Sequence, residues 1–434
     1  MTIELGSRWP SVFAGTTLCV LTVAGCIHES HLVGENPVDA MVVPTSDALA
    51  DSAAMPDGGS FDATPVVPLG GASTGGWPIA ISPEEVARRL SQFLLRKPPS
   101  ATLTAAVVAA APRTNEEVGQ LTDGLLLEDA SLDGRQAFYR WWLRLDAFAT
   151  ATRDATLFPA FTDEVRSALV VQALMFAEDI TWRPQGDLAT LLTEPAAFVT
   201  PATASWFPGI TIPSATSATR VMLDPSQYAG IITQPAVVAT LDYSTRAEPS
   251  GRGMQVWGRY LCQAIPPEPP GKLIAAIPVG MTTRQWLEQS VDSVQSCGAC
   301  HGLSDPAGFA FGHFDAVGAF RVTEGDLAVD TSGALPANRL WPTDSMTPDL
   351  RFTGVVDLAK QLATLSEVAR CFAEKWLAFA TGKYADVPSD ALHVTDGVLI
   401  ADTGYVIKRA TVQGRLHLRG IIRAVTETHT FLDP

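Results

Sequence analysis

Three residues in the second half of the chain have the types and spacing that bind haem covalently. Residues 297–301 read Cys-Gly-Ala-Cys-His, and a Cys-x-x-Cys-His motif is the attachment site of c-type haem. The two thiols form thioethers with the haem vinyl groups, and the adjacent imidazole is the proximal iron ligand. The motif therefore predicts one covalent haem c, held by Cys297, Cys300 and His301, and with it redox chemistry.

Zinc and a redox disulfide are the other chemistries that use such a cysteine pair. A structural zinc site needs about four ligands, and no second pair at short spacing follows His301. A thioredoxin-like disulfide follows a strand in a parallel α/β pattern, whereas the surrounding residues are typical of helix. A disulfide between Cys297 and Cys300, in a protein without haem, stays open as an alternative.

The start of the chain is typical of an exported lipoprotein. Residues 12–25 form an apolar, small-residue run that is too short to span a bilayer, as in the hydrophobic region of a signal peptide. The run ends in LTVAGC at residues 21–26, which resembles a bacterial lipobox. We expect residues 1–25 to be a signal peptide and Cys26 to carry lipid. An ordinary cleaved signal with a chance cysteine is the alternative.

The lipid would anchor the protein in the cell envelope. Ile27 is not the Asp of an inner-membrane retention signal, so we expect the outer membrane, facing the periplasm or the cell surface. Residues 27–78 contain no Lys or Arg and are rich in Pro, Gly, Ser and Ala. This composition predicts that residues 26–78 form an acidic flexible tether.

Composition limits the partners of the folded body. The chain has 434 residues, of which 47% are hydrophobic, enough for two or three domains with a large core. The formal net charge of −16 argues against nucleic-acid binding and favours a basic redox partner protein. No segment after the signal has ~18 consecutive apolar residues, so the membrane contact we expect is the anchor alone.

Hydrophobic periodicity predicts a mainly α fold. Ser82, Pro83 and Glu85 form a typical helix start, and residues 196–224 indicate a loop with a short hairpin. The expected helices cover residues 83–96, 103–111, 115–128, 132–150, 162–180, 187–193, 252–264, 283–295, 354–364, 366–381 and 413–430.

A proline cluster at residues 266–270 marks a boundary between domains. We expect a helical N-terminal domain over residues 79–250. A cytochrome-c-like haem-binding domain follows over residues 251–350, and a small helical C-terminal domain closes the chain over residues 351–434.

The residues after the haem motif resemble those of a known family. Residues 303–321, LSDPAGFAFGHFDAVGAFR, are similar to the pattern of planctomycete-type cytochrome-c-domain proteins. Further resemblance extends over residues 80–430, in the domains of unknown function 1595, 1592, 1588 and 1585. It implies an exported, mostly helical, haem-bearing protein without a settled activity. Gly312 and His313 stand where the family has an acidic residue and Asn, so no role of that acidic residue is carried over.

Several residues near the motif are candidates for haem contacts. Met346 is the expected sixth iron ligand, with His313 or an open position as alternatives; Met346 would then be a surface residue without this role. Asp305 and Pro306 are expected to cover the haem edge or to accept the hydrogen bond from His301, with a plain turn as the alternative. Arg321 is expected to pair with a haem propionate or to form a surface salt bridge.

The remaining cysteines predict a disulfide. Of six cysteines, one leaves with the signal peptide, one takes lipid and two take haem. Cys262 and Cys371 remain as an even pair in an oxidising compartment, which favours a disulfide. Two buried free thiols are the alternative.

Three functions agree with these features. The first is an electron-transfer lipoprotein with one haem c. The second is a haem-dependent oxidoreductase with an unknown substrate, bound in a deep polar pocket between the domains. The third is a non-redox binding or scaffold lipoprotein. The sequence leaves open whether the protein is an enzyme.

Overall fold

The computed structural model describes residues 76–212, 217–263, 265, 276–291, 295–340, 348–382 and 397–433. The side chains of residues 295–297 and 299 are not described. The expected signal peptide over residues 1–25, the lipidated Cys26, nearly all of the tether and the expected ligand Met346 lie outside the described residues.

The described chain is mainly helical, as the periodicity predicts. Its helices are α2 (Pro83–Leu90), α3 (Ala101–Ala110), α4 (Asn115–Leu126), α5 (Leu132–Leu143), α6 (Leu145–Ala149), α7 (Asp163–Trp182), α8 (Leu188–Thr193), α9 (Pro235–Val238), α10 (Pro249–Gln255), α11 (Thr283–Ser290), α12 (Gln295–Phe309), α13 (Ala337–Leu340), α14 (Val355–Leu362), α15 (Ser366–Thr381), α16 (Gly397–Ala410), α17 (Leu418–Thr426) and α18 (His429–Leu432).

The described strands form antiparallel pairs of two to four residues per strand. The pairs are β1 (Ala196–Val199) with β2 (Thr219–Met222), β3 (Thr323–Glu324) with β4 (Leu327–Ala328), β5 (Gly333–Leu335) with β6 (Leu350–Phe352), and β7 (Thr411–Val412) with β8 (Arg415–Leu416). The first pair is the hairpin expected within residues 196–224.

Side-chain caps start the helices where the sequence indicates. The Ser82 hydroxyl accepts the Glu85 amide at the start of α2. At α4, Thr114 and Glu117 form a reciprocal capping box. Gly382 ends α15 with a left-handed backbone, φ +64°, as a terminating glycine does.

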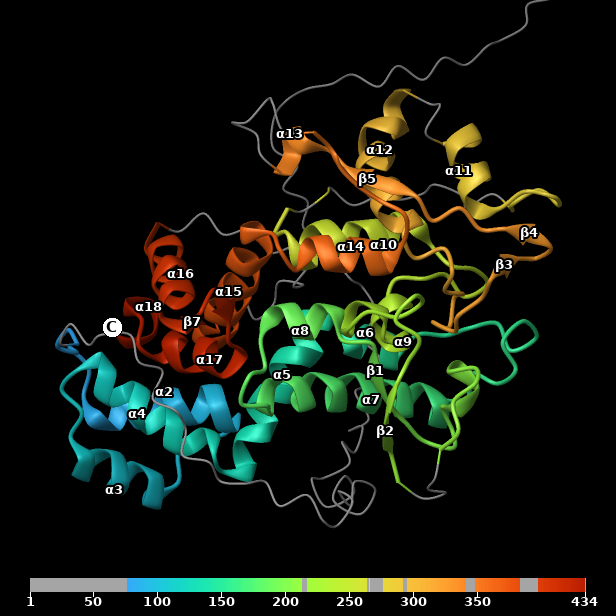
Figure 1. Ribbon diagram of the computed structural model, residues 1–434. Coiled ribbons are helices and arrows are strands. Elements are labelled where there is room, and N and C mark those ends of the chain that lie inside the picture. Colours follow the sequence, from blue (N-terminus) through green and yellow to red (C-terminus); the bar gives the residue numbers. More distant parts are fainter. Residues whose placement is uncertain are drawn as a thin grey trace, which may run out of the picture.

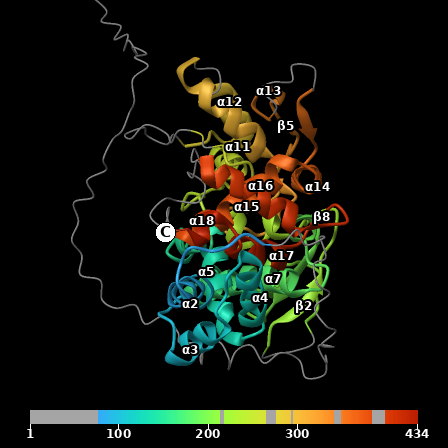
Figure 2. The same cartoon turned by 90° about the vertical axis from the view of Figure 1, so that its left-hand side faces the viewer.

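The first and last helices of the described chain share one core. Helices α2 and α4 lie beside α15, α17 and α18 in both views (Figures 1 and 2). At the centre of this core, Phe138 of α5 stacks on Trp376 of α15, with ring centroids 3.5 Å apart. Segments far apart in the sequence are thus joined by aromatic packing.

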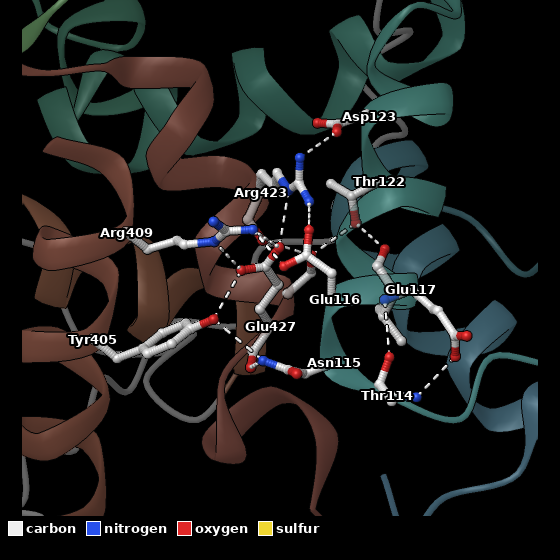
Figure 3. Close-up of polar contacts among 12 residues, drawn as sticks. Thr114, Asn115, Glu116, Glu117, Thr122, Asp123, Tyr405, Arg409, Arg423 and Glu427 are labelled. Atoms are coloured by element: carbon white, nitrogen blue, oxygen red, sulfur yellow. Dashed lines mark hydrogen bonds and ion pairs between the residues drawn. The ribbon is translucent and has the colours of Figure 1, made fainter. Parts of the chain in front are cut away.

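A charged network joins the same two ends of the chain (Figure 3). Arg423 of α17 contacts Glu116, Asp123 and Glu427 at 2.6–2.8 Å. Arg409 of α16 contacts Glu427 at 2.9 Å and also Glu116. The Glu427 side chain is fully buried, so these guanidinium groups balance a charge that water does not reach.

Several predicted helix boundaries are wrong, and one helix was missed. The helix expected over residues 132–150 is interrupted at Arg144, whose left-handed backbone separates α5 from α6. The helix expected over residues 413–430 begins only at Leu418, because β7 and β8 form a hairpin before it. Helix α16, over residues 397–410, was not predicted.

Helix α12 and its neighbours form one end of the molecule. In both views α12, α13 and β5 lie at the end opposite α3 (Figures 1 and 2). Helix α10 continues as a π-helical turn, Val256–Tyr260, and packs against α12. The helix expected over residues 283–295 ends earlier, at Ser290, and a separate helix, α12, carries the cysteine motif itself.

The predicted disulfide is confirmed. Cys262, just after the π-helical turn, is bonded to Cys371 in α15. Both residues are buried. The bond ties the segment that packs on α12 to the helical core formed by the chain ends.

Candidate functional site

The motif residues lie on one side of α12. Cys297, Cys300 and His301 are three and four positions apart in a continuous helix, a spacing that places residues on the same helical face. The Cys300 side chain is exposed and its thiol is free. The Cys297 side chain is not described, so the Cys297–Cys300 disulfide of the third alternative stays a prediction.

His301 is held by two polar side chains at the same ring nitrogen. Its Nδ1 lies 3.0 Å from Oδ2 of Asp305, one turn along α12, and 3.2 Å from Oγ of Ser250 in α10. The His301 side chain is 15% exposed, whereas that of Asp305 is fully buried. The ring is therefore fixed from behind while its outer edge reaches the surface, and the nitrogen facing away from these partners is Nε2.

This arrangement is not a Ser-His-Asp hydrolase triad. In a triad the serine hydroxyl and the carboxylate contact opposite ring nitrogens, so that the imidazole relays a proton between them. Here Ser250 and Asp305 both contact Nδ1. Both side chains therefore orient the imidazole, as the hydrogen-bond partners of a metal-ligating histidine do.

A second buried carboxyl group, that of Glu248, lies beside Ser250. Burial raises the pKa of Glu248 to about 7, opposed by Arg246 and by a hydrogen bond with Ser250. The carboxylates of Asp242 and Asp305 add to the rise because like charges disfavour ionisation. The carboxyl groups of Glu248, Asp242 and Asp305 therefore interact with one another in the protein interior.

Close helix packing places Ser250 against His301. A side chain at Gly253 of α10 would collide with the backbone of Ser304 in α12, and one at Gly308 would collide with that of Pro249. The Trp257 indole donates to the Leu303 carbonyl at 2.8 Å. Glycines at these crossing points let the two backbones approach closely.

Arg252 fixes the segment that follows α12. Its guanidinium is 2.5 Å from Asp242 and donates to the carbonyls of Phe311, Phe314 and Asp315 at 2.7–2.8 Å. The Arg252 and Asp242 side chains are almost fully buried. This ion pair anchors the end of α12 to the first part of the chain.

Arg321 and His313 have structural partners in this segment. Arg321 Nε donates to the Gly312 carbonyl at 3.1 Å, and a terminal nitrogen of Arg321 lies 3.6 Å from Glu324. Burial lowers the pKa of Arg321. His313 Nδ1 donates to the Arg321 carbonyl at 2.9 Å. A propionate contact of Arg321 and iron ligation by His313 stay predictions.

Pro306 lies inside α12 rather than in a turn. Asp305 is buried behind His301, so the expectation that it contacts the imidazole is met, whereas the plain turn is wrong. The cavity beside α12, lined by Thr283, Gly308 and Phe309 among others, has a volume of about 20 Å³. This is space for a water molecule, and it is not the deep pocket expected for a substrate.

Sequence reasoning missed Ser250, Glu248 and Arg252 as site residues. Nothing in the local sequence links these residues to His301. The pairing of α10 with α12 is a long-range contact. Among the described residues, no group of three His, Cys, Asp or Glu side chains is arranged to hold a metal ion.

Comparisons with known proteins support the family resemblance. Three families match, each described as a protein of unknown function: DUF1592 over residues 81–208, DUF1588 over residues 228–324 and DUF1585 over residues 350–393. These are planctomycete cytochrome-c-like domain families. These matches suggest a cytochrome-c-related protein of unknown function. No curated protein and no solved structure matches it.

Proposed function

We propose that the protein is an exported lipoprotein that binds one haem c covalently and transfers electrons. The observation that carries the proposal is the position of His301. Its Nδ1 is held by a buried carboxylate and a hydroxyl, as expected for an imidazole that presents Nε2 to a metal. The proposal also rests on the cytochrome-c-like families that match the chain.

The residues present fit a covalent haem. Cys300 offers a free, exposed thiol one position before His301, and Cys297 lies one helical turn earlier. Cys297 and Cys300 would hold the porphyrin edge, and His301 would bind the iron. When bound, the haem supplies a one-electron couple. The protein's own part is to orient the imidazole through Asp305 and Ser250.

Electron transfer is our preferred reaction, because an exposed haem edge passes an electron without a substrate pocket. An oxidoreductase needs a pocket of several hundred Å³ with convergent polar groups. Two cavities of about 20 Å³ and 10 Å³ are found beside α10 and α12 in the described part of the chain, so the oxidoreductase stays the alternative.

The proposal includes a lipid-anchored location in the cell envelope and a basic redox partner. Cys26 would carry the lipid, and the acidic tether would hold the folded body away from the membrane. No helix among the described residues is long and apolar enough to cross a bilayer. The strong negative charge of the chain favours association with a basic redox partner.

The decisive experiment is expression of the full chain together with haem-attachment machinery. A denaturing gel stained for haem and a reduced-minus-oxidised spectrum are expected to give a covalent haem band and a sharp reduced α-peak. The double variant Cys297→Ser/Cys300→Ser removes both thioethers, whereas Cys262→Ser leaves the motif intact. Covalent haem lost in the double variant and kept in Cys262→Ser supports the proposal.

Absence of covalent haem from the wild-type protein would reject the haem proposal. A Cys26→Ser variant tests the anchor separately, because it is expected to lose fatty-acid labelling and membrane association while retaining haem. High-spin features that respond to peroxide would favour the oxidoreductase alternative over electron transfer.

A further inference from the structure

The carboxylate behind His301 is unusually well protected from water. The Asp305 side chain is fully buried, and its Oδ2 is 3.0 Å from Nδ1 of His301. The other oxygen, Oδ1, accepts a hydrogen bond from the hydroxyl of Ser304 at 3.0 Å. Both oxygens are therefore fixed by the fold.

Two arginines of this region contact other carboxylates. The guanidinium of Arg252 is paired with Asp242 and three backbone carbonyls, and Arg246 lies 3.9 Å from Glu248. The charge of Asp305 thus acts directly on the imidazole. In a low-dielectric interior a charge at hydrogen-bond distance has a strong effect on its partner.

We propose that Asp305 is a positioning residue that sets the reduction potential of the haem, an inference that rests on the proposed function. A carboxylate that accepts the Nδ1–H of a ligating histidine raises the basicity of the ligand. The oxidised iron carries one more positive charge than the reduced iron, so a fixed negative charge behind the ligand favours the oxidised form. Asp305 therefore lowers the potential relative to a neutral acceptor at the same position.

The Asp305 charge makes the haem a better electron donor than it would be with a neutral acceptor behind His301, because the charge stabilises the oxidised form.

The experiment compares midpoint potentials of full-length holoprotein by spectroelectrochemistry at fixed pH. Asp305→Asn keeps the size of the side chain and an oxygen that accepts from Nδ1–H, but removes the charge. We expect the ferrous-to-ferric ratio at a given applied potential to rise at least tenfold, which is about 59 mV for a one-electron couple. Ser250→Ala removes a neutral contact with the same nitrogen and is expected to change the ratio less than threefold.

The outcomes are distinguishable. Equal midpoint potentials in the wild type and Asp305→Asn would overturn the inference. So would a shift of the midpoint potential in Ser250→Ala as large as that in Asp305→Asn. In either case covalent haem in the wild type would still support the proposed function. Absence of covalent haem from the wild type would overturn both. If Asp305→Asn does not accumulate as folded protein, Asp305→Ser, which is smaller and uncharged, is measured in its place with the same expectation.

Discussion

The carbonyl oxygen of Ser304 occupies the place where a side chain on Gly253 would stand. Gly253→Ala therefore forces α10 away from α12, and we expect a loss of about 1–3 kcal/mol in the free energy of unfolding. Urea denaturation measures it. Gly302→Ala is the matched control, because no atom lies within 4 Å of the new methyl group and alanine is the better helix former, by about 0.5–1 kcal/mol. Equal stability of the two variants would contradict the close contact.

The raised pKa of Glu248 predicts a stability that falls as the pH rises. Its pKa is about 7 in the folded protein, against 4.5 for the unperturbed group. The folded state therefore binds a proton more tightly than the unfolded state between these values, and stability is lost as the pH rises from about 4.5 to 7.

The loss attributable to Glu248 is roughly 3 kcal/mol. Glu248→Gln removes this contribution, so its unfolding free energy is expected to depend less on pH over that range and to exceed that of the wild type at pH 8. Urea denaturation at pH 5 and pH 8 checks the sign. The same change in unfolding free energy between pH 5 and pH 8 in the wild type and in Glu248→Gln would refute the prediction.

The Asp242–Arg252 ion pair is expected to be sensitive to loss of one partner. Both side chains are buried, so Asp242→Asn leaves an uncompensated guanidinium and is expected to cost about 3–5 kcal/mol. The control is Glu288→Gln, which breaks the exposed Arg284–Glu288 pair and is expected to cost under about 1 kcal/mol. Thermal unfolding of both variants tests the difference; similar values would show that burial of the first pair has no energetic consequence.

The Cys262–Cys371 disulfide is expected to resist reductant until the protein unfolds. Both sulfurs are buried, and the bond spans 109 residues. The double variant Cys262→Ser/Cys371→Ser is expected to lose about 2–5 kcal/mol, because the unfolded chain is no longer constrained. Thiol alkylation with and without urea checks accessibility. Labelling of these cysteines in the native, unreduced protein would exclude the bond.

Local signals predicted much of the fold. Caps such as Ser82 and Thr114, and the terminator Gly382, act within one helical turn, so their positions follow from the sequence. The interruption at Arg144 did not follow, because arginine is a good helix former and no local signal marks its left-handed backbone. Helix α16, which begins at Gly397, was not predicted because no capping pattern was recognised at its start.

The same distinction applies to the candidate site. The contact of Asp305 with His301 joins residues four apart on a helix, and the sequence indicated it. Ser250 and Glu248 are about fifty residues from His301, and only the packing of α10 on α12 brings them there. Sequence periodicity carries no information about which helices pack together.

The charged network between α4 and α17 has a consequence for biogenesis. Glu116 and Arg423 are 307 residues apart, so a chain that crosses a membrane from its N-terminus delivers α4 long before its partner. Until then the carboxylates of α4 stay hydrated and its apolar face lacks α17. In the proposed export, residues 297–301 would emerge earlier than α17, which would allow the proposed haem attachment to an open chain. Closure of the two ends would then be the final step of maturation.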